Sequence, residues 1–324
     1  MVSAGAKAAP FVETFDSAAS SARFAVTSVT STGGNGFPET YAEFGFDYSG
    51  IGASRLTTPI PAAPGGGSMK GLLLAANVNG GAPSSINFYP ILTGLGLPID
   101  GDTGLPVIDV DYRMEFDFWA GVNNSNSGTS EFLQLGAQSD GDGEHLNGFV
   151  DASPDSDFLE VNINGDLGSS DYIPFTTDAG VPVLAAAGFI PNTAPGPVAA
   201  FPNPPYSAQA AGGAPGEAWA TAEVAHIAGV TTMSFNGVEI VSIAGDFANT
   251  NGVDGLPWFG YTDFFGSQAG GESLDVATGE DFDPFNASFV IIDNVRVVLI
   301  PEPGSLAVAM LGLPLLARRS TRCR

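Results

Sequence analysis

The chain has 324 residues, with 10 Lys and Arg against 35 Asp and Glu, and its formal net charge at pH 7 is −25. Such a charge repels a phosphate backbone and excludes nucleic-acid binding as the main activity. A single cysteine, Cys323, excludes a disulfide framework and thiolate-held zinc or iron–sulfur centres, and 43 Gly with 24 Pro disfavour an all-helical chain.

Short segments rich in aromatic and β-branched residues, separated by Gly- and Pro-rich stretches, predict a series of β-strands. Residues 70–78 are apolar enough to be buried on both faces, whereas the body shows no helical periodicity. The expected strands are residues 11–15, 22–30, 41–48, 70–78, 86–90, 110–122, 131–138, 158–164, 218–225, 230–235, 238–244, 258–265 and 288–299.

Two local patterns indicate how these strands are arranged. In residues 110–122, apolar side chains from Tyr112 to Phe118 alternate with polar ones, which predicts a half-buried antiparallel strand. The same alternation puts Phe44 and Phe46 on one face of their strand. Asn236-Gly237 predicts a tight hairpin, because both positions tolerate a positive φ.

The fold class that follows is all-β, a two-sheet antiparallel jelly-roll sandwich over residues 10–300. The longest Gly/Pro-rich stretch, residues 191–216, is interpreted as a surface loop of this one domain rather than a linker. Residues 1–9 contain the small-residue pattern Ala4-Gly5-Ala6 and are expected to be a signal-peptide remnant or a disordered terminus.

The last 24 residues differ in composition from the body. Pro301-Glu302-Pro303 is followed by an apolar run ending at residue 317 and by the basic pair Arg318-Arg319. Residues 304–317 form a helix of about 21 Å at most, short of a hydrocarbon core of about 30 Å. We therefore expect a short C-terminal hydrophobic helix that anchors the chain transiently; a buried hairpin with a chance motif is the alternative.

This order of motif, apolar run and arginines resembles the PEP-CTERM sorting signal of Gram-negative-type bacteria. The resemblance implies a membrane exosortase as a processing partner, passage through the inner membrane and export to the cell surface or an extracellular matrix. It covers residues 301–324 and makes no statement about the activity of the body.

A second resemblance covers residues 11–299. Segments 218–224, 234–238, 259–263 and 292–297, with Phe15-Asp16 near an expected first strand that pairs with the last, are similar to concanavalin A-like (laminin-G-type) jelly rolls. The resemblance implies a curved sheet, often with a carbohydrate-facing side and sometimes with a calcium ion.

Catalytic residues are not found in the sequence. Glu115 and Asp117 share a strand face, as do the carboxylates of retaining glycosidases on this fold, but Trp119 or Ala120 stands where a second glutamate is required. The face is interpreted as solvated, and His145 and His226 as surface or turn residues.

Two sets of residues are candidates for binding. Acidic residues occupy relative positions 1, 3, 5 and 12 of residues 140–151, as in a calcium loop, although His145 stands at position 6 where a glycine is expected. We interpret the segment as either an irregular calcium loop or a solvated turn. The acidic residues are Asp140, Asp142, Glu144 and Asp151. Aromatic rings suited to stacking on sugars, or to the core, are Trp119, Trp219, Trp258 and Tyr261.

The functional expectation is an exported, non-enzymatic surface or matrix protein that binds polysaccharide. One alternative is a secreted polysaccharide-degrading enzyme, a glycoside hydrolase or lyase, on the same fold. The other is a calcium-dependent adhesin.

Overall fold

The computed structural model covers the full chain. The residues that it describes are 9–30, 40–51, 59–76, 84–92, 97, 110–121, 131–139, 159–164, 172–178, 181–184, 186, 188–191, 193–202, 213–215, 218–244, 256–263 and 289–300.

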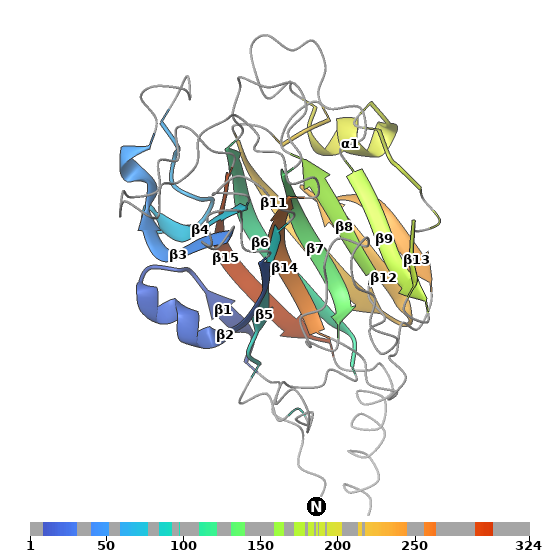
Figure 1. Ribbon diagram of the computed structural model, residues 1–324, viewed down its shortest axis with the longest axis horizontal. Coiled ribbons are helices and arrows are strands. Elements are labelled where there is room, and N and C mark those ends of the chain that lie inside the picture. The colour runs from blue at the N-terminus through green and yellow to red at the C-terminus, as the bar shows by residue number, and fades with distance from the viewer. Residues whose placement is uncertain are drawn as a thin grey trace, which may run out of the picture.

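Two antiparallel sheets form the molecule, and Figure 1 shows one lying across the other. Sheet A has the strand order β13-β12-β11-β6-β15-β4-β3, and β1 also pairs with β15. Its strands are β1 (Phe11–Glu13), β3 (Thr40–Asp47), β4 (Lys70–Ala76), β6 (Tyr112–Gly121), β11 (Trp219–Ile227), β12 (Val230–Phe235), β13 (Val238–Ala244) and β15 (Phe289–Leu299).

Sheet B has the strand order β10-β9-β8-β7-β14-β5-β2. Its strands are β2 (Phe24–Thr30), β5 (Ser84–Pro90), β7 (Glu131–Ser139), β8 (Leu159–Asn164), β9 (Tyr172–Asp178), β10 (Val181–Leu184) and β14 (Leu256–Asp263). Three short helices complete the described elements: η1 (Ala18–Arg23), η2 (Tyr48–Gly50) and α1 (Pro195–Ala200), which packs against β13.

The main core lies between the sheets and follows the period-two alternation of the strands. On β6, the side chains from Tyr112 through Met114 and Phe116 to Phe118 all point into it. They meet side chains of sheet B such as Phe88 and Phe259, whose rings stack with centroids 5.6 Å apart. The jelly-roll sandwich expected from the sequence is therefore the fold of the described chain.

A second, smaller core covers one end of the outer face of sheet A. Leu73 and Ala75 of β4 belong to it, whereas Leu72 and Leu74 belong to the main core, which confirms the expectation that this strand is buried on both faces. The other members are Tyr48, Ile51, Ile60, Trp119, Phe289 and Ile291.

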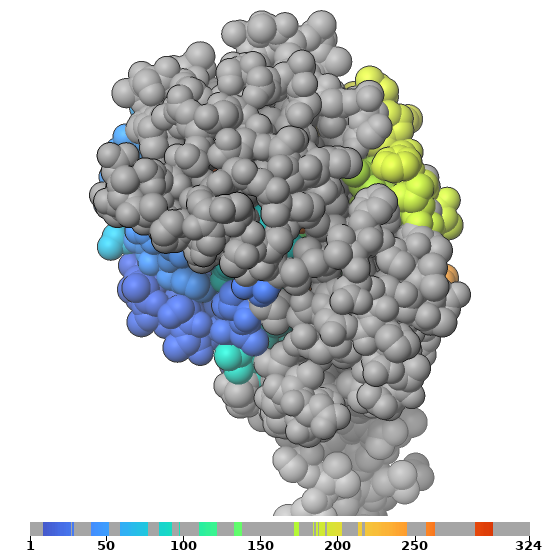
Figure 2. Space-filling view, in the orientation of Figure 1, coloured from blue at the N-terminus to red at the C-terminus, as the bar shows by residue number. Residues whose placement is uncertain are grey.

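The expected hairpin and the pairing of first and last strands are both confirmed. β12 and β13 have the predicted bounds, and Asn236 and Gly237 have φ values of 50° and 76°. β1 pairs with β15 through Phe11 and Val297. Figure 2 shows the segment that follows β1 at the surface, in blue.

Three expectations about local structure were wrong. The strands β9 and β10 were missed, and α1 lies within residues that we read as a loop. Phe44 and Phe46 do not share a face, because a β-bulge at Gly45 (φ 76°) turns Phe44 into the main core and Phe46 into the second one. A sequence pattern of period two does not detect an inserted residue.

The sorting tail lies outside the described residues, and so does the expected C-terminal helix. Among the helices that the structure describes, none is long and apolar enough to cross a membrane.

Candidate functional site

The outer face of sheet A changes character along the strands. At one end it carries Trp119 and Trp219, which lie opposite each other on β6 and β11 with ring centroids 5.9 Å apart. Two residues further along each strand, Asp117 lies opposite Thr221, and after two more, Glu115 lies opposite Glu223. Aromatic, carboxylate and charged rows thus follow one another on a single face.

A pair of carboxylates occupies the middle of this face. Asp117 of β6 and Asp293 of β15 are direct cross-strand neighbours and are 7% and 2% exposed. Asp117 accepts hydrogen bonds from Thr221 Oγ1 at 2.7 Å and from Asn294 Nδ2 at 2.8 Å. Asp293 Oδ1 accepts one from its neighbour's backbone N–H at 2.7 Å. The expectation of a solvated face is therefore wrong at Asp117.

Burial raises the pKa of Asp293 to about 7, and the Asp117 carboxylate adds to this rise, whereas the backbone N–H of Asn294 opposes it. Two negative charges on neighbouring strands, both withdrawn from water, repel each other strongly. The Asp293 carboxyl therefore changes between its neutral and its ionised form near pH 7.

A β-bulge shapes this pair. The register of β15 against β6 shifts between Asp293 and Arg296, and Asn294 has a φ of 54°. The left-handed conformation is tolerated by asparagine better than by most residues. The bulge lets both Asp293 and Asn294 reach the Asp117 carboxylate region while Val295 returns to the main core.

The segment of residues 59–68, which we call the strap, lies against the same face. Asn294 Nδ2 donates to Pro64 O at 2.9 Å, and Trp219 Nε1 donates to Pro61 O at 2.7 Å. The N–H of Ala63 donates to the Tyr48 hydroxyl at 3.2 Å. The strap thus connects the aromatic row with the carboxylate pair.

Beyond the pair, the face is open and charged. Arg113 Nε lies 3.4 Å from a carboxylate oxygen of Glu223, and Arg296 Nη1 lies 3.7 Å from one of Glu115. These four side chains are between about a quarter and a half exposed. Burial raises the pKa of Glu223, Arg113 lowers it, and the facing Glu115 raises it.

The four aromatic candidates have different surroundings. Trp258 is fully buried and Tyr261 is 4% exposed, both against the main core, and Trp119 is 2% exposed in the second core. Of the two roles left open for these three rings, stacking on sugars is corrected and packing in the core is the one they have, because all three are buried. Trp219 is partly exposed and remains available.

The other sequence candidates are less informative. The calcium candidates Asp140, Asp142, Glu144 and Asp151, and the sorting residues Pro301, Glu302, Pro303, Arg318 and Arg319, lie outside the described residues. Within the part of the chain that is described, no three His, Cys, Asp or Glu side chains converge as metal ligands. His226 was expected at the surface or in a turn, but it lies in β11, is 7% exposed, and its Nδ1 lies 3.0 Å from Thr231 Oγ1.

Sequence reasoning missed Asp293 and Asn294 as site residues. A signal existed, since this polar pair interrupts the strand of residues 289–299, in which Arg296 is the one other polar residue. The sequence does not show which strand lies beside them, because the partner Asp117 is 176 positions away along the chain.

No family model matches the chain, and no curated protein matches it. Among solved structures, it is similar to a β-glucanase of Bacillus licheniformis, with 8% identity, a TM-score of 0.40 and coverage of 90% of this chain and 98% of that one. It is also similar to a Bacillus subtilis protein of unknown function with a galectin-like fold (9%, 0.43, 91% and 97%). A third is the carbohydrate-binding module CBM66 from Bacillus subtilis (10%, 0.32, 70% and 86%). With TM-scores this low, these likenesses carry no weight for function.

Proposed function

We propose that the protein is an exported bacterial surface or matrix protein whose jelly-roll body binds polysaccharide without cleaving it. Export rests on the resemblance of residues 301–324 to an exosortase-processed sorting tail. Binding rests on the outer face of sheet A. The two parts are independent and are tested separately.

The single observation that carries the binding proposal is the position of Trp219. This partly exposed ring lies on the same face as Thr221 and Glu223, at successive alternate positions of β11. Saccharide rings pack apolar C–H faces on aromatic rings, and their hydroxyls bond to planar polar groups such as carboxylates and guanidinium groups. Arg113, at 3.4 Å from Glu223, supplies such a group further along the same face, six residues along β6 from the row of Trp219.

The proposal that the protein does not cleave its ligand is supported by the burial of the carboxylate pair. General acid–base catalysis requires the acid to reach the glycosidic oxygen within hydrogen-bond distance. Asp117 is 7% exposed, and both of its oxygens already accept hydrogen bonds. Asp293 is still less exposed, at 2%.

Binding is tested with the full-length protein on a polysaccharide panel, with calcium and with chelator. Trp219→Ala should weaken binding about three- to tenfold, the loss of one aromatic contact, whereas Trp219→Phe, which keeps a ring, should retain most of it. Phe189→Ala removes another exposed ring, 53% exposed, outside this face and serves as the control. Absence of binding to every polysaccharide, or equal loss in the control, contradicts the proposal. Binding that requires calcium favours the adhesin alternative.

Export is tested in a host that contains an exosortase. Replacing Pro301, Glu302 and Pro303 together by alanine should leave the protein in the inner-membrane fraction, because the apolar run of 304–317 would stay uncleaved. Release of this variant to the medium at the normal level contradicts the sorting role.

One observation favours a second candidate function, a polysaccharide hydrolase. Asp293 has a pKa of about 7 and faces Asp117, which is the arrangement of a general acid beside an ionised carboxylate. This function requires the strap to move away from the pair. Release of reducing ends from a bound polysaccharide, abolished in Asp293→Asn, would establish it in place of simple binding.

A further inference from the structure

The strap is attached to sheet A at several points. Pro61 O and Pro64 O accept hydrogen bonds from Trp219 and Asn294, and the N–H of Ala63 donates to Tyr48. At its far end, the Ser68 hydroxyl donates to the Asp16 carboxylate. The bonds made by Pro61, Pro64 and Ser68 lie at the surface, whereas the Ala63 bond is buried and Ile60 packs in the second core.

Asn294 couples the strap directly to the carboxylate pair. Its Nδ2 donates to Asp117 Oδ2 at 2.8 Å and to Pro64 O at 2.9 Å, and its backbone N–H donates to Asp293 Oδ1. Gly66 of the strap also lies beside Asp293, since a Cβ built on Gly66 would lie 3.5 Å from Asp293 Oδ2. Loss or movement of the hydrogen bond between Asn294 and Asp117 therefore also affects the hydrogen bond between Asn294 and the strap.

The groups that surround Asp293 favour its neutral form. Asp117 of β6, Glu13 of β1 and Asp16 of the following turn all act on it as negative charges, and Tyr48 of η2 is neutral. Two further neighbours, from β11 and the strap, are uncharged: Thr221 and Gly66. The nearby cations are engaged elsewhere: Lys70 acts on Asp16, and Arg296 lies against Glu115.

We propose that the Asp117–Asp293 pair is a proton-operated latch on the strap. With the proton on Asp293, the pair carries one negative charge and the strap stays closed over it. When Asp293 gives its proton to water, two facing carboxylates are left without solvent, and opening of the strap relieves this by hydrating them. The Trp119 indole N–H, buried without a partner in the described structure, would gain water in the same opening.

The expected size of the effect follows from proton linkage. Taking a pKa of 3.8 for Asp293 with the strap open and about 7 with it closed, the opening equilibrium constant rises about tenfold between pH 6 and pH 8 and levels off above that. Hydrogen exchange of the Ala63 amide reports it, because its bond to the Tyr48 hydroxyl exists only while the strap is closed, whereas the Gly66 amide bonds to Ala63 O within the strap itself. Exchange rates are first corrected for the intrinsic effect of pH.

Two comparisons make the experiment decisive. Asp293→Asn removes the titrating group, so its Ala63 amide should exchange at a rate that is independent of pH after correction. Glu239→Gln removes an exposed carboxylate from β13 and should keep the tenfold rise. Within the wild-type protein, the Ile91 amide, which bonds to Arg23 O at 2.8 Å in another region, is the internal reference.

A rise confined to the strap and lost in Asp293→Asn supports the latch. A wild-type strap without the rise, an equal rise at Ile91, or a rise that persists in Asp293→Asn overturns it. If Asp293→Asn does not fold, the comparison of strap and Ile91 amides in the wild-type protein decides alone.

Discussion

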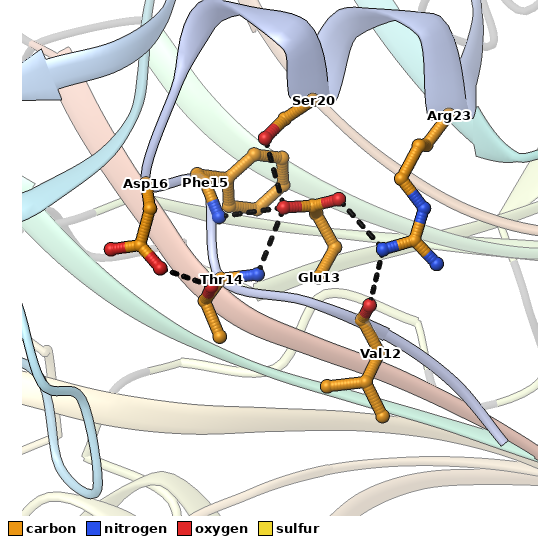
Figure 3. A network of polar contacts seen from close by, with 7 residues as sticks. All are labelled: Val12, Glu13, Thr14, Phe15, Asp16, Ser20 and Arg23. Atoms are coloured by element: carbon orange, nitrogen blue, oxygen red, sulfur yellow. Dashed lines mark hydrogen bonds and ion pairs between the residues drawn. The ribbon is translucent and has the colours of Figure 1, made fainter.

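Replacing Glu13 by alanine should destabilise the N-terminal corner of the sandwich strongly, because one carboxylate holds it together (Figure 3). Glu13 Oε1 accepts hydrogen bonds from the backbone N–H of Thr14 at 3.0 Å, the N–H of Phe15 at 2.9 Å and the hydroxyl of Ser20 at 2.8 Å. Its other oxygen lies 2.8 Å from Arg23 Nη1. The side chain therefore ties β1 to η1.

The four hydrogen bonds and ion pairs of Glu13 contribute unequally to the free energy of unfolding. Those to Phe15 and Ser20 are buried, and a buried donor that loses a charged acceptor costs about 1.5–3 kcal/mol. Arg23 is 43% exposed, so its ion pair contributes less than about 1 kcal/mol. Phe15 also has a positive φ of 51°, and its ring stacks on Phe24 at 5.4 Å, so the bond to its N–H supports a strained residue in the core.

We expect Glu13→Ala to lower the free energy of unfolding by about 3–5 kcal/mol, out of about 5–15 kcal/mol for a typical domain. Glu13→Gln keeps one acceptor oxygen and should lower the free energy of unfolding by only about 1 kcal/mol, chiefly through the lost ion pair. Arg23→Met should cost a similar small amount, with some loss of the guanidinium contact 4.3 Å above Phe11.

Urea unfolding followed by tryptophan fluorescence measures these differences at constant slope. The reasoning fails if Glu13→Ala costs less than about 1 kcal/mol. It fails equally if Glu13→Gln is as harmful as Glu13→Ala, because charge rather than the acceptor oxygen would then be responsible.

Two further predictions concern stability. The pKa of Asp293 is 3.8 in the unfolded chain and about 7 in the folded one, so the folded state binds an extra proton between these pH values. The free energy of unfolding should therefore fall as the pH rises from about 4 to about 7, by at most about 1.4 kcal/mol per pH unit. Asp293→Asn should remove this slope in urea unfolding at several pH values. A slope unchanged in the variant would assign the effect to other groups. Gly136→Ala would place a Cβ 1.7 Å from the Trp258 ring and should cost about 3 kcal/mol, whereas Gly50→Ala, with nothing within 4 Å, should be near neutral; equal thermal midpoints would refute the packing argument.

Much of the fold was predictable from local patterns. The alternation in β6 predicted which side chains enter the core, and Asn236-Gly237 predicted the hairpin, because both depend on neighbours along the chain. The bulge at Gly45 and the strands β9 and β10 were not predictable in this way. The bulge is set by a distant segment, through the close approach of Gly45 to Ser17. The strands β9 and β10 pair locally with each other, but each contains a proline, which argues against a strand in the sequence.

The sequence alone determined the fold class, the strong negative charge and the presence of a sorting-like tail, since composition and periodicity are local properties. Tertiary structure alone decided which polar residues meet. The side chains of Asp117 and Asp293 become a pair only because β6 and β15 are neighbours in sheet A, and the pKa of Asp293 rises only because that pairing withdraws it from water. Tertiary structure likewise separated Trp219, partly exposed on β11 of sheet A, from Trp258, enclosed in the core on β14 of sheet B.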